Sequence, residues 1–181
     1  MSSSAPSAAL WEAIAAEAAE ESALWASALL PREQRELLPV FSPLGEERFA
    51  VGLESIYEGY LLHYGRPRLF APVDRDTAVL LGDYLYAHGL VRIAAHGEVD
   101  VVADLAELLS LCAQLRAEGR PGDGAAWAAT VACLGGGDAL EAARATLRDD
   151  GDPAALLGLA ALEAGPDAVE RALALHAGRV V

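Results

Sequence analysis

The most informative stretch of the sequence is Ala78-Val-Leu-Leu-Gly-Asp-Tyr-Leu-Tyr-Ala-His-Gly-Leu90. It is a run of apolar and helix-favouring residues without proline, preceded by Asp74 and Asp76 and followed by Gly97. Aspartate is a favourable residue at the start of a helix, and glycine commonly follows the last turn. The sequence therefore predicts a long apolar helix that begins at Asp74 or Asp76, runs to Ile93 and stops near Gly97.

The composition of the whole chain also favours helices. Hydrophobic residues make up 54% of the 181 residues, but much of this share is alanine, and only 3 Phe and 5 Tyr are present. Alanine has the highest helix propensity, and the β-branched residues that favour strands are sparse. We therefore expect an all-α helical bundle, in a chain long enough to bury a sizeable core.

Further helices are predicted between breaks that are rich in Pro and Gly. The first has an acidic and an apolar face, which is typical of an amphipathic helix. The predicted segments are 8–30, 31–38, 46–64, 98–118, 125–134, 138–148, 153–164 and 166–177. Because the last three are short, we divide the chain into a helical core at residues 1–137 and a helical tail at residues 138–181, which could also belong to the same domain.

The charge of the chain argues against several classes of partner. Its net charge is −14, and it contains no lysine and no asparagine. Binding to nucleic acids or to anionic membranes depends on clustered basic residues. No apolar run reaches the ~18 residues of a membrane-spanning helix, and residues 1–7 lack the basic stretch of a secretion signal. We therefore expect a cytoplasmic protein that binds neither nucleic acid nor membrane.

Several segments resemble the all-α polyprenyl diphosphate synthases. The stretch Ala78–Ala87 is similar to the Gly-Asp helix of that family, and Gly65-Arg-Pro67 precedes it where the family has an Arg-Arg-Gly-x-Pro loop. The stretch His96-Gly-Glu-Val-Asp-Val-Val-Ala-Asp-Leu-Ala resembles the family's turn into its next core helix, and Trp127-Ala-Ala-Thr130 loosely resembles a later aromatic-Lys-Thr-Ala segment. The resemblance covers about residues 49–135 and implies a truncated isoprenoid synthase fold.

The resemblance also implies where chemistry would take place. These synthases ionise an allylic diphosphate with Mg²⁺ held between two aspartate-rich motifs, because Mg²⁺ prefers hard oxygen ligands. The first motif falls on Glu54-Ser-Ile-Tyr-Glu58, so Glu54 and Glu58 are candidate Mg²⁺ ligands, with an ordinary solvated helix face as the alternative. Arg66 and Arg68 are candidate diphosphate-binding residues, with simple neutralisation of the acidic surface as the alternative.

Other positions depart from the family pattern. His63-Tyr64 replaces the arginine pair, and Ala129 replaces the lysine of the later segment. The second aspartate-rich motif is represented only by Asp149-Asp150-Gly-Asp152, which contains a helix-breaking glycine and reads as a loop. Asp83 lies within the apolar helix, where an unpaired carboxylate is costly, so we expect a structural partner for it such as Arg or Tyr.

These features lead to one main hypothesis and three alternatives. The main one is a non-catalytic partner or regulatory subunit in isoprenoid diphosphate metabolism, present as a homodimer or as a heteromer with a complete polyprenyl synthase. The first alternative is an active Mg²⁺-dependent prenyltransferase that condenses isopentenyl diphosphate with an allylic diphosphate in a reduced site. The others are an unrelated helical adaptor and a carrier of an apolar ligand, which would require a cavity.

Overall fold

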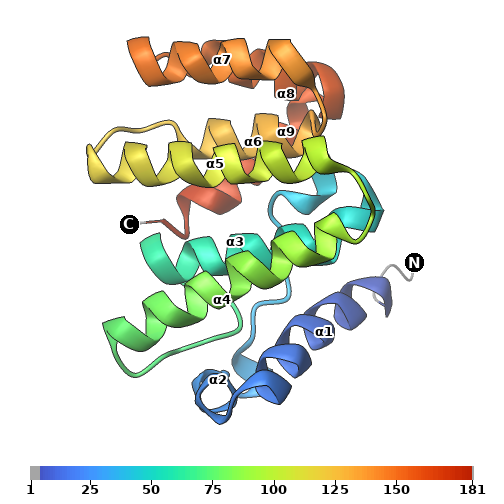
Figure 1. Ribbon diagram of the computed structural model, residues 1–181, viewed down its shortest axis with the longest axis vertical. Coiled ribbons are helices and arrows are strands. Elements are labelled where there is room, and N and C mark those ends of the chain that lie inside the picture. Colours follow the sequence, from blue (N-terminus) through green and yellow to red (C-terminus); the bar gives the residue numbers. More distant parts are fainter. Residues whose placement is uncertain (1–4, 181) are drawn as a thin grey trace. The chain divides into compact units, whose positions relative to one another are not determined.

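The computed structural model describes residues 5–180, which form α-helices joined by short connections (Figure 1). Among these residues there is no β-strand, only two isolated bridges. The all-α prediction is confirmed. Residues 1–4, part of the stretch in which we expect no secretion signal, and residue 181 lie outside the described residues. No helix within residues 5–180 combines the length and the apolar character needed to cross a membrane.

The helices pack into two compact units whose segments alternate along the chain. Unit 1 consists of the residues up to Pro39, of Ala50–Arg92 and of the residues from Arg179. Unit 2 consists of Val40–Phe49 and Ile93–Gly178. These boundaries differ from the division expected after residue 137. Residues 138–178 pack in the same unit as the two helices that precede them.

Unit 1 is built from four helices. They are α1 (Ala5–Glu21), α2 (Ala23–Ala28), α3 (Ala50–Tyr64) and most of α4 (Arg75–Ala94). The predicted start of α4 is confirmed, because Asp74 Oδ1 accepts a hydrogen bond from the Thr77 backbone N–H at 2.7 Å. Trp11, Leu62, Phe70 and Leu85 belong to its buried apolar core, which joins all four helices with the loop after α3.

The segment predicted as one helix over residues 8–30 is interrupted at Ser22. The backbone of Ser22 is extended, with φ −153° and ψ 135°. Its Oγ accepts a hydrogen bond from the Leu24 N–H at 3.1 Å. A serine that satisfies an otherwise unpaired N–H starts a new helix favourably, so the chain forms α1 and α2 in place of one long helix.

The helix predicted from Pro31 to Leu38 is reduced to a single 3-10 turn, Arg32–Gln34. The residues around this turn are extended and pair with the loop after α3. The Leu30 N–H donates to the Leu69 carbonyl at 2.9 Å, and the Glu36 N–H donates to the Arg68 carbonyl at 3.1 Å. Tertiary hydrogen bonds therefore replace the helical ones that the local sequence favours.

Two pairs of glycines allow α3 and α4 to pack backbone against backbone in opposite directions (Figure 1). A Cβ atom on Gly59 would lie 2.8 Å from the Gly82 carbonyl oxygen, and a Cβ on Gly89 would lie 2.8 Å from the Gly52 carbonyl oxygen. Between these contacts, the Ser55 hydroxyl donates to the Leu85 carbonyl at 3.2 Å. Each helix has its two glycines seven residues apart, so both fall on the same face.

Unit 2 is built around one of its own helices, which is short and almost completely buried. Its helices are α5 (Val99–Ala117), α6 (Asp123–Ala132), α7 (Gly137–Asp150), α8 (Ala154–Ala164) and α9 (Pro166–Ala177), preceded by 3-10 turns at Ser42–Leu44 and Glu47–Phe49. Every residue of α6 from Gly124 to Val131 is buried. The Trp127 ring stacks on Phe41 at 5.5 Å between centroids. The small residues of α6 let other helices approach it closely.

The packing of α3 on α4 predicts that Gly59→Ala is strongly unfavourable. The added methyl group would meet the Gly82 carbonyl, and a backbone atom of a packed helix moves only at the expense of its neighbours. We expect the free energy of unfolding, measured by urea denaturation, to fall by about 1–3 kcal/mol.

Gly158→Ala in α8 is the matched control. A Cβ at Gly158 meets no atom within 4 Å, and alanine favours helix over glycine by about 1 kcal/mol, so this variant should be as stable as the native protein or more stable. Equal effects of the two substitutions would contradict the close packing of α3 on α4.

Candidate functional site

The two candidate metal ligands and one candidate diphosphate-binding residue come together in unit 1. Glu54 and Glu58 lie one turn apart on α3, and Arg68 lies in the loop that follows this helix. Arg68 Nη1 is 2.5 Å from Glu54 Oε2, and Arg68 Nε is 2.9 Å from Glu58 Oε2. All three side chains are at most 1% exposed. We call this group the Glu54–Arg68–Glu58 triad.

Additional hydrogen bonds satisfy the polar atoms of the triad. Glu58 Oε1 accepts from the backbone N–H groups of Arg68 and Leu69, both at 2.7 Å. Arg68 Nη1 also donates to the Leu38 carbonyl at 3.1 Å, and Nη2 donates to the Glu54 carbonyl at 3.3 Å. Glu58 therefore fixes the course of the loop as well as the guanidinium group.

Aromatic rings enclose the guanidinium group of Arg68. Its central carbon lies 4.6 Å from the ring centroid of Trp11 and 5.0 Å from that of Tyr57, distances typical of cation–π contacts. Burial by itself lowers the pKa of Arg68, but the charges and hydrogen bonds of Glu54 and Glu58 outweigh it and raise the pKa. Arg68 therefore stays charged inside the core. Burial also raises the pKa of the Tyr57 hydroxyl.

The surroundings of Glu54 and Glu58 bear on both interpretations of this pair. The alternative of a solvated helix face is wrong, because the two side chains are buried. A role as Mg²⁺ ligands stays a prediction, and it would require the ion to displace the guanidinium group that now binds both carboxylates. No group of three or more His, Cys, Asp or Glu side chains suited to a metal ion occurs among residues 5–180.

Arg66 has an environment quite different from that of Arg68. Its side chain is 63% exposed, and Nη1 donates to Glu36 Oε1 at 2.8 Å. The other oxygen of Glu36 accepts from Arg179 Nη2, also at 2.8 Å. The hydrogen bond from Arg179 is the largest cause of the lowered pKa of the Glu36 carboxyl. Arg66 thus neutralises an acidic side chain, and its role in diphosphate binding stays a prediction.

Asp83 differs from the sequence-based expectation. Its side chain is 63% exposed, so it does not lie among apolar neighbours. Its Oδ1 atom is 3.1 Å from His63 Nε2, which makes the partner a histidine in place of the expected Arg or Tyr. The apolar residues around Asp83 in the sequence occupy the other faces of α4. The hydrophobic stretch was therefore a poor guide to the burial of this single position.

His63 fills the space beside the glycine of the Gly-Asp pair. A Cβ on Gly82 would lie 2.6 Å from His63 Nε2, and the His63 ring stacks on Tyr86 with 5.1 Å between centroids. Burial lowers the pKa of His63 and outweighs the opposite effect of Asp83. His63, at a position where the polyprenyl synthases that the sequence resembles have an arginine, thus takes part in the contact between α3 and α4.

Unit 2 contains a second buried ionic network, which sequence reasoning missed. Arg144 on α7 is 2% exposed, and its Nη1 donates to Asp104 Oδ1 at 3.0 Å. Its Nη2 donates to the Thr130 hydroxyl at 3.0 Å. The only signal in the sequence was an arginine at helical spacing among the apolar residues Leu140, Ala143 and Leu147. Thr130, which matches a family position loosely, is therefore bound in a structural contact.

The acidic segment after residue 148 serves helix ends. Asp149 and Asp150 close α7, and Gly151 follows with φ +76°, a left-handed conformation that glycine adopts without strain. Asp152 Oδ1 accepts a hydrogen bond from the Ala154 N–H at 2.9 Å. The prediction of a loop is confirmed for Gly151 and Asp152 but is wrong for Asp149 and Asp150, which belong to the last turn of α7.

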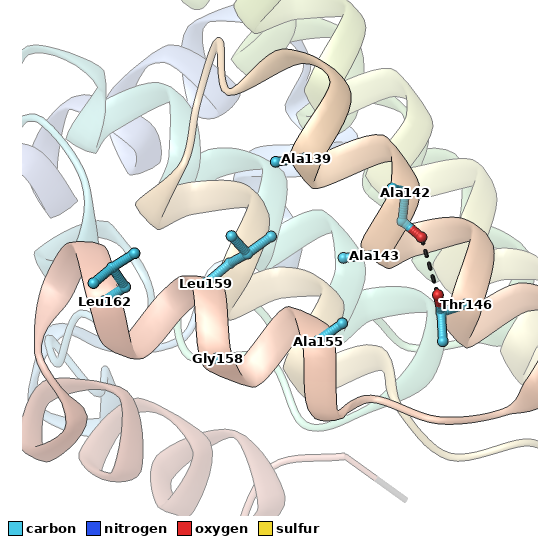
Figure 2. A pocket seen from close by; sticks show the side chains of 8 residues that line it. All are labelled: Ala139, Ala142, Ala143, Thr146, Ala155, Gly158, Leu159 and Leu162. Atoms are coloured by element: carbon cyan, nitrogen blue, oxygen red, sulfur yellow. Dashed lines mark hydrogen bonds between the residues drawn. The ribbon is translucent and has the colours of Figure 1, made fainter.

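An open apolar groove of about 420 Å³ lies between α7 and α8 (Figure 2). From α7 it is lined by Ala139, Ala142, Ala143 and Thr146, whose hydroxyl is turned back to the Ala142 carbonyl at 3.1 Å. From α8 it is lined by Ala155, Gly158, Leu159 and Leu162. A hollow of about 280 Å³ shares Ala139 and Leu159 with this groove and includes Glu163. We call the first of these the α7/α8 groove.

Comparisons with protein-family models, with curated proteins and with solved structures find no match to this chain. The resemblance to polyprenyl synthases therefore depends on the sequence segments quoted above.

The triad predicts unequal effects of two neighbouring arginine substitutions. Arg68→Leu would leave two buried carboxylates without a counter-charge, so we expect it to lower the free energy of unfolding by about 3–5 kcal/mol. Arg66→Leu removes an exposed pair and should change stability by no more than about 1 kcal/mol. Urea denaturation monitored by circular dichroism measures both, and equal effects would argue against a buried role for Arg68.

The environment of His63 predicts a contribution to the pH dependence of stability. Its pKa is lowered in the folded protein, whereas in the unfolded chain it is about 6.5. The unfolded chain then binds the proton more readily, so this contribution is present above about pH 6.5 and is lost as the pH falls.

The corresponding experiment compares urea denaturation of the native protein and of His63→Gln at about pH 7.5 and about pH 5.5, on either side of the ordinary histidine pKa. The variant should lose less stability on acidification than the native protein. An equal or greater loss in the variant would show that His63 does not resist protonation in the folded state.

Proposed function

We propose that this protein is a non-catalytic helical subunit that acts by binding another protein. The observation that carries the proposal is the closed Glu54–Arg68–Glu58 triad. Both carboxylates that would bind Mg²⁺ in a prenyltransferase accept hydrogen bonds from one arginine in the core. A second cation placed there would meet the positive charge of Arg68 at short range in a poorly screened environment.

The way the triad is connected supports a structural role for these residues. Glu58 binds two successive backbone N–H groups of the loop that carries Arg68. A metal site that exchanges substrate and product needs open coordination positions. Here the same atoms hold the loop against α3, so opening the site would also release the loop.

The expected link to isoprenoid metabolism rests on the sequence resemblance alone. On that basis we propose a complete polyprenyl diphosphate synthase as the first partner to test, with a homodimer as the other possible assembly. Purification of the tagged protein from its source, followed by mass spectrometry, tests this choice. Recovery of a polyprenyl synthase in stoichiometric amount would support this choice. A stable complex with an unrelated protein would show that this protein is a helical subunit that acts outside isoprenoid metabolism.

The closed triad predicts that Mg²⁺ does not bind at Glu54 and Glu58. The thermal unfolding temperature in millimolar Mg²⁺ should equal that in a sodium salt of the same ionic strength, because a ligand stabilises a fold only by binding to it. The isolated protein should also form no product from isopentenyl diphosphate and an allylic diphosphate. Mg²⁺-dependent product that is lost in Glu54→Gln would overturn the proposal in favour of a prenyltransferase.

A further inference from the structure

We propose that the α7/α8 groove binds a cationic amphipathic helix of a partner protein. This inference rests on the proposed function, because it names the surface and the chemistry through which such a subunit would bind. Its basis is the combination of an uncovered apolar helix, a groove lined by small side chains and, at both ends of the groove, carboxylates that form no ion pair within the described part of the chain.

The first observation is that α8 is apolar on every side but is covered on only part of its surface. Its sequence, Ala154-Ala-Leu-Leu-Gly-Leu-Ala-Ala-Leu-Glu-Ala164, contains a single charged residue. Leu156 and Ala160 are buried in unit 2, whereas Leu162 is 78% exposed. A helix that is hydrophobic all round is normally buried all round. The exposed face of α8 therefore has the composition of a surface that another element covers.

The second observation is the shape of this face. Ala155, Gly158 and Leu162 follow one another at helical spacing along α8, and alanines of α7 form the opposite wall (Figure 2). Side chains this small do not fill the groove, so the backbone of an incoming helix can come close to α7 and α8. An amphipathic helix binds in such a groove by placing apolar residues at i, i+3, i+4 and i+7.

The third observation is the charge at the two ends of the groove. Asp149 and Asp150 follow Thr146 by three and four residues in the last turn of α7, so helical spacing places them at this end of the groove. Asp152 lies in the short connection that leads from α7 into α8. At the other end, Asp138 precedes Ala142 by four residues.

These carboxylates are not neutralised by the neighbouring arginines. Of the two arginines on α7, Arg144 binds Asp104 in the interior and Arg148 pairs with Glu107 on α5. No ion pair involves the five carboxylates at or near the ends of the groove among the described residues; they are Asp138, Asp149, Asp150, Asp152 and Glu163.

This charge distribution indicates which kind of partner can bind in the groove. A second copy of the chain would bring the same carboxylates to the groove, and like charges at an interface oppose binding. A helix with an apolar face and with Lys or Arg near both ends would complement both the groove and its charges. We therefore infer a basic helix of another protein in preference to self-association.

The experiment uses a fluorescent synthetic helix of about 18 residues, or five turns, with Leu and Ala on one face and Lys near both ends. Its affinity for the full-length protein is measured by fluorescence anisotropy at low and at physiological salt. A second peptide with the same apolar face, but with Glu in place of Lys, reports the contribution of charge. The proposal predicts that the lysine peptide binds, that salt weakens this binding, and that the glutamate peptide does not bind.

Two pairs of variants show whether binding takes place in the groove. Gly158→Phe places a ring in the groove from a position where an added Cβ meets no atom within 4 Å, and it should weaken binding at least about tenfold. Val91→Phe adds the same ring at an exposed position of α4 and is the control. Asp149→Asn with Asp150→Asn should weaken binding more than Glu20→Gln with Glu21→Gln, although both double variants remove two negative charges. Circular dichroism checks that each variant is folded.

Several outcomes would overturn the proposal. They are binding of the glutamate peptide, equal binding by Gly158→Phe and the native protein, and equal effects of the two double variants. Self-association of the native protein that Gly158→Phe abolishes would identify a second copy as the occupant. If a natural complex is isolated and survives Gly158→Phe, the groove proposal fails while the proposed function stands. Mg²⁺-dependent prenyl transfer would instead remove the proposed function.

Discussion

The ionic contact of Arg68 with Glu54 and Glu58 is the constraint on which unit 1 depends. Burying a guanidinium group and two carboxylates is costly unless each is paired and hydrogen-bonded. The structure meets this condition with two ion pairs, with backbone N–H groups that bind Glu58, and with the rings of Trp11 and Tyr57. The loop after α3 must therefore follow one path, and Leu30 and Glu36 pair with that loop through backbone hydrogen bonds.

The Gly-Asp segment has a physical explanation in the same unit that does not involve catalysis. Gly82 allows α4 to approach Gly59 and His63 on α3, and Asp83 lies at the surface beside His63. A pattern of apolar residues around Gly-Asp is what a closely packed helix pair needs. The resemblance to polyprenyl synthases and the requirements of packing therefore favour the same residues, so this segment alone does not distinguish a catalytic from a structural origin.

Helix positions could be predicted well from the sequence, because caps and breaks such as Asp74, Gly151 and Pro166 act locally. The break at Ser22 and the loss of the helix at 31–38 were not predicted. The helix at 31–38 is lost because this segment pairs with a loop that is distant in the sequence. Only part of the candidate site was predicted from the sequence. Spacing placed Glu54 and Glu58 on one face, and the basic loop was recognised, but no sequence pattern shows that an arginine ten residues after Glu58 turns back between the carboxylates. The glycines at seven-residue spacing on α3 and α4 were a usable signal that went unrecognised.

In unit 2, Arg144 binds Asp104 and Thr130 in the interior, while the α7/α8 groove is open, apolar and acidic at its ends. Buried charges thus serve the fold, and the uncovered surface is suited to binding. A crystal structure determined in the presence of Mn²⁺, with anomalous data, would show whether Arg68 or a metal ion occupies the space between Glu54 and Glu58. We expect the Arg68 guanidinium between the carboxylates and no anomalous peak there. A peak bound to Glu54 and Glu58, with Arg68 displaced, would contradict this expectation.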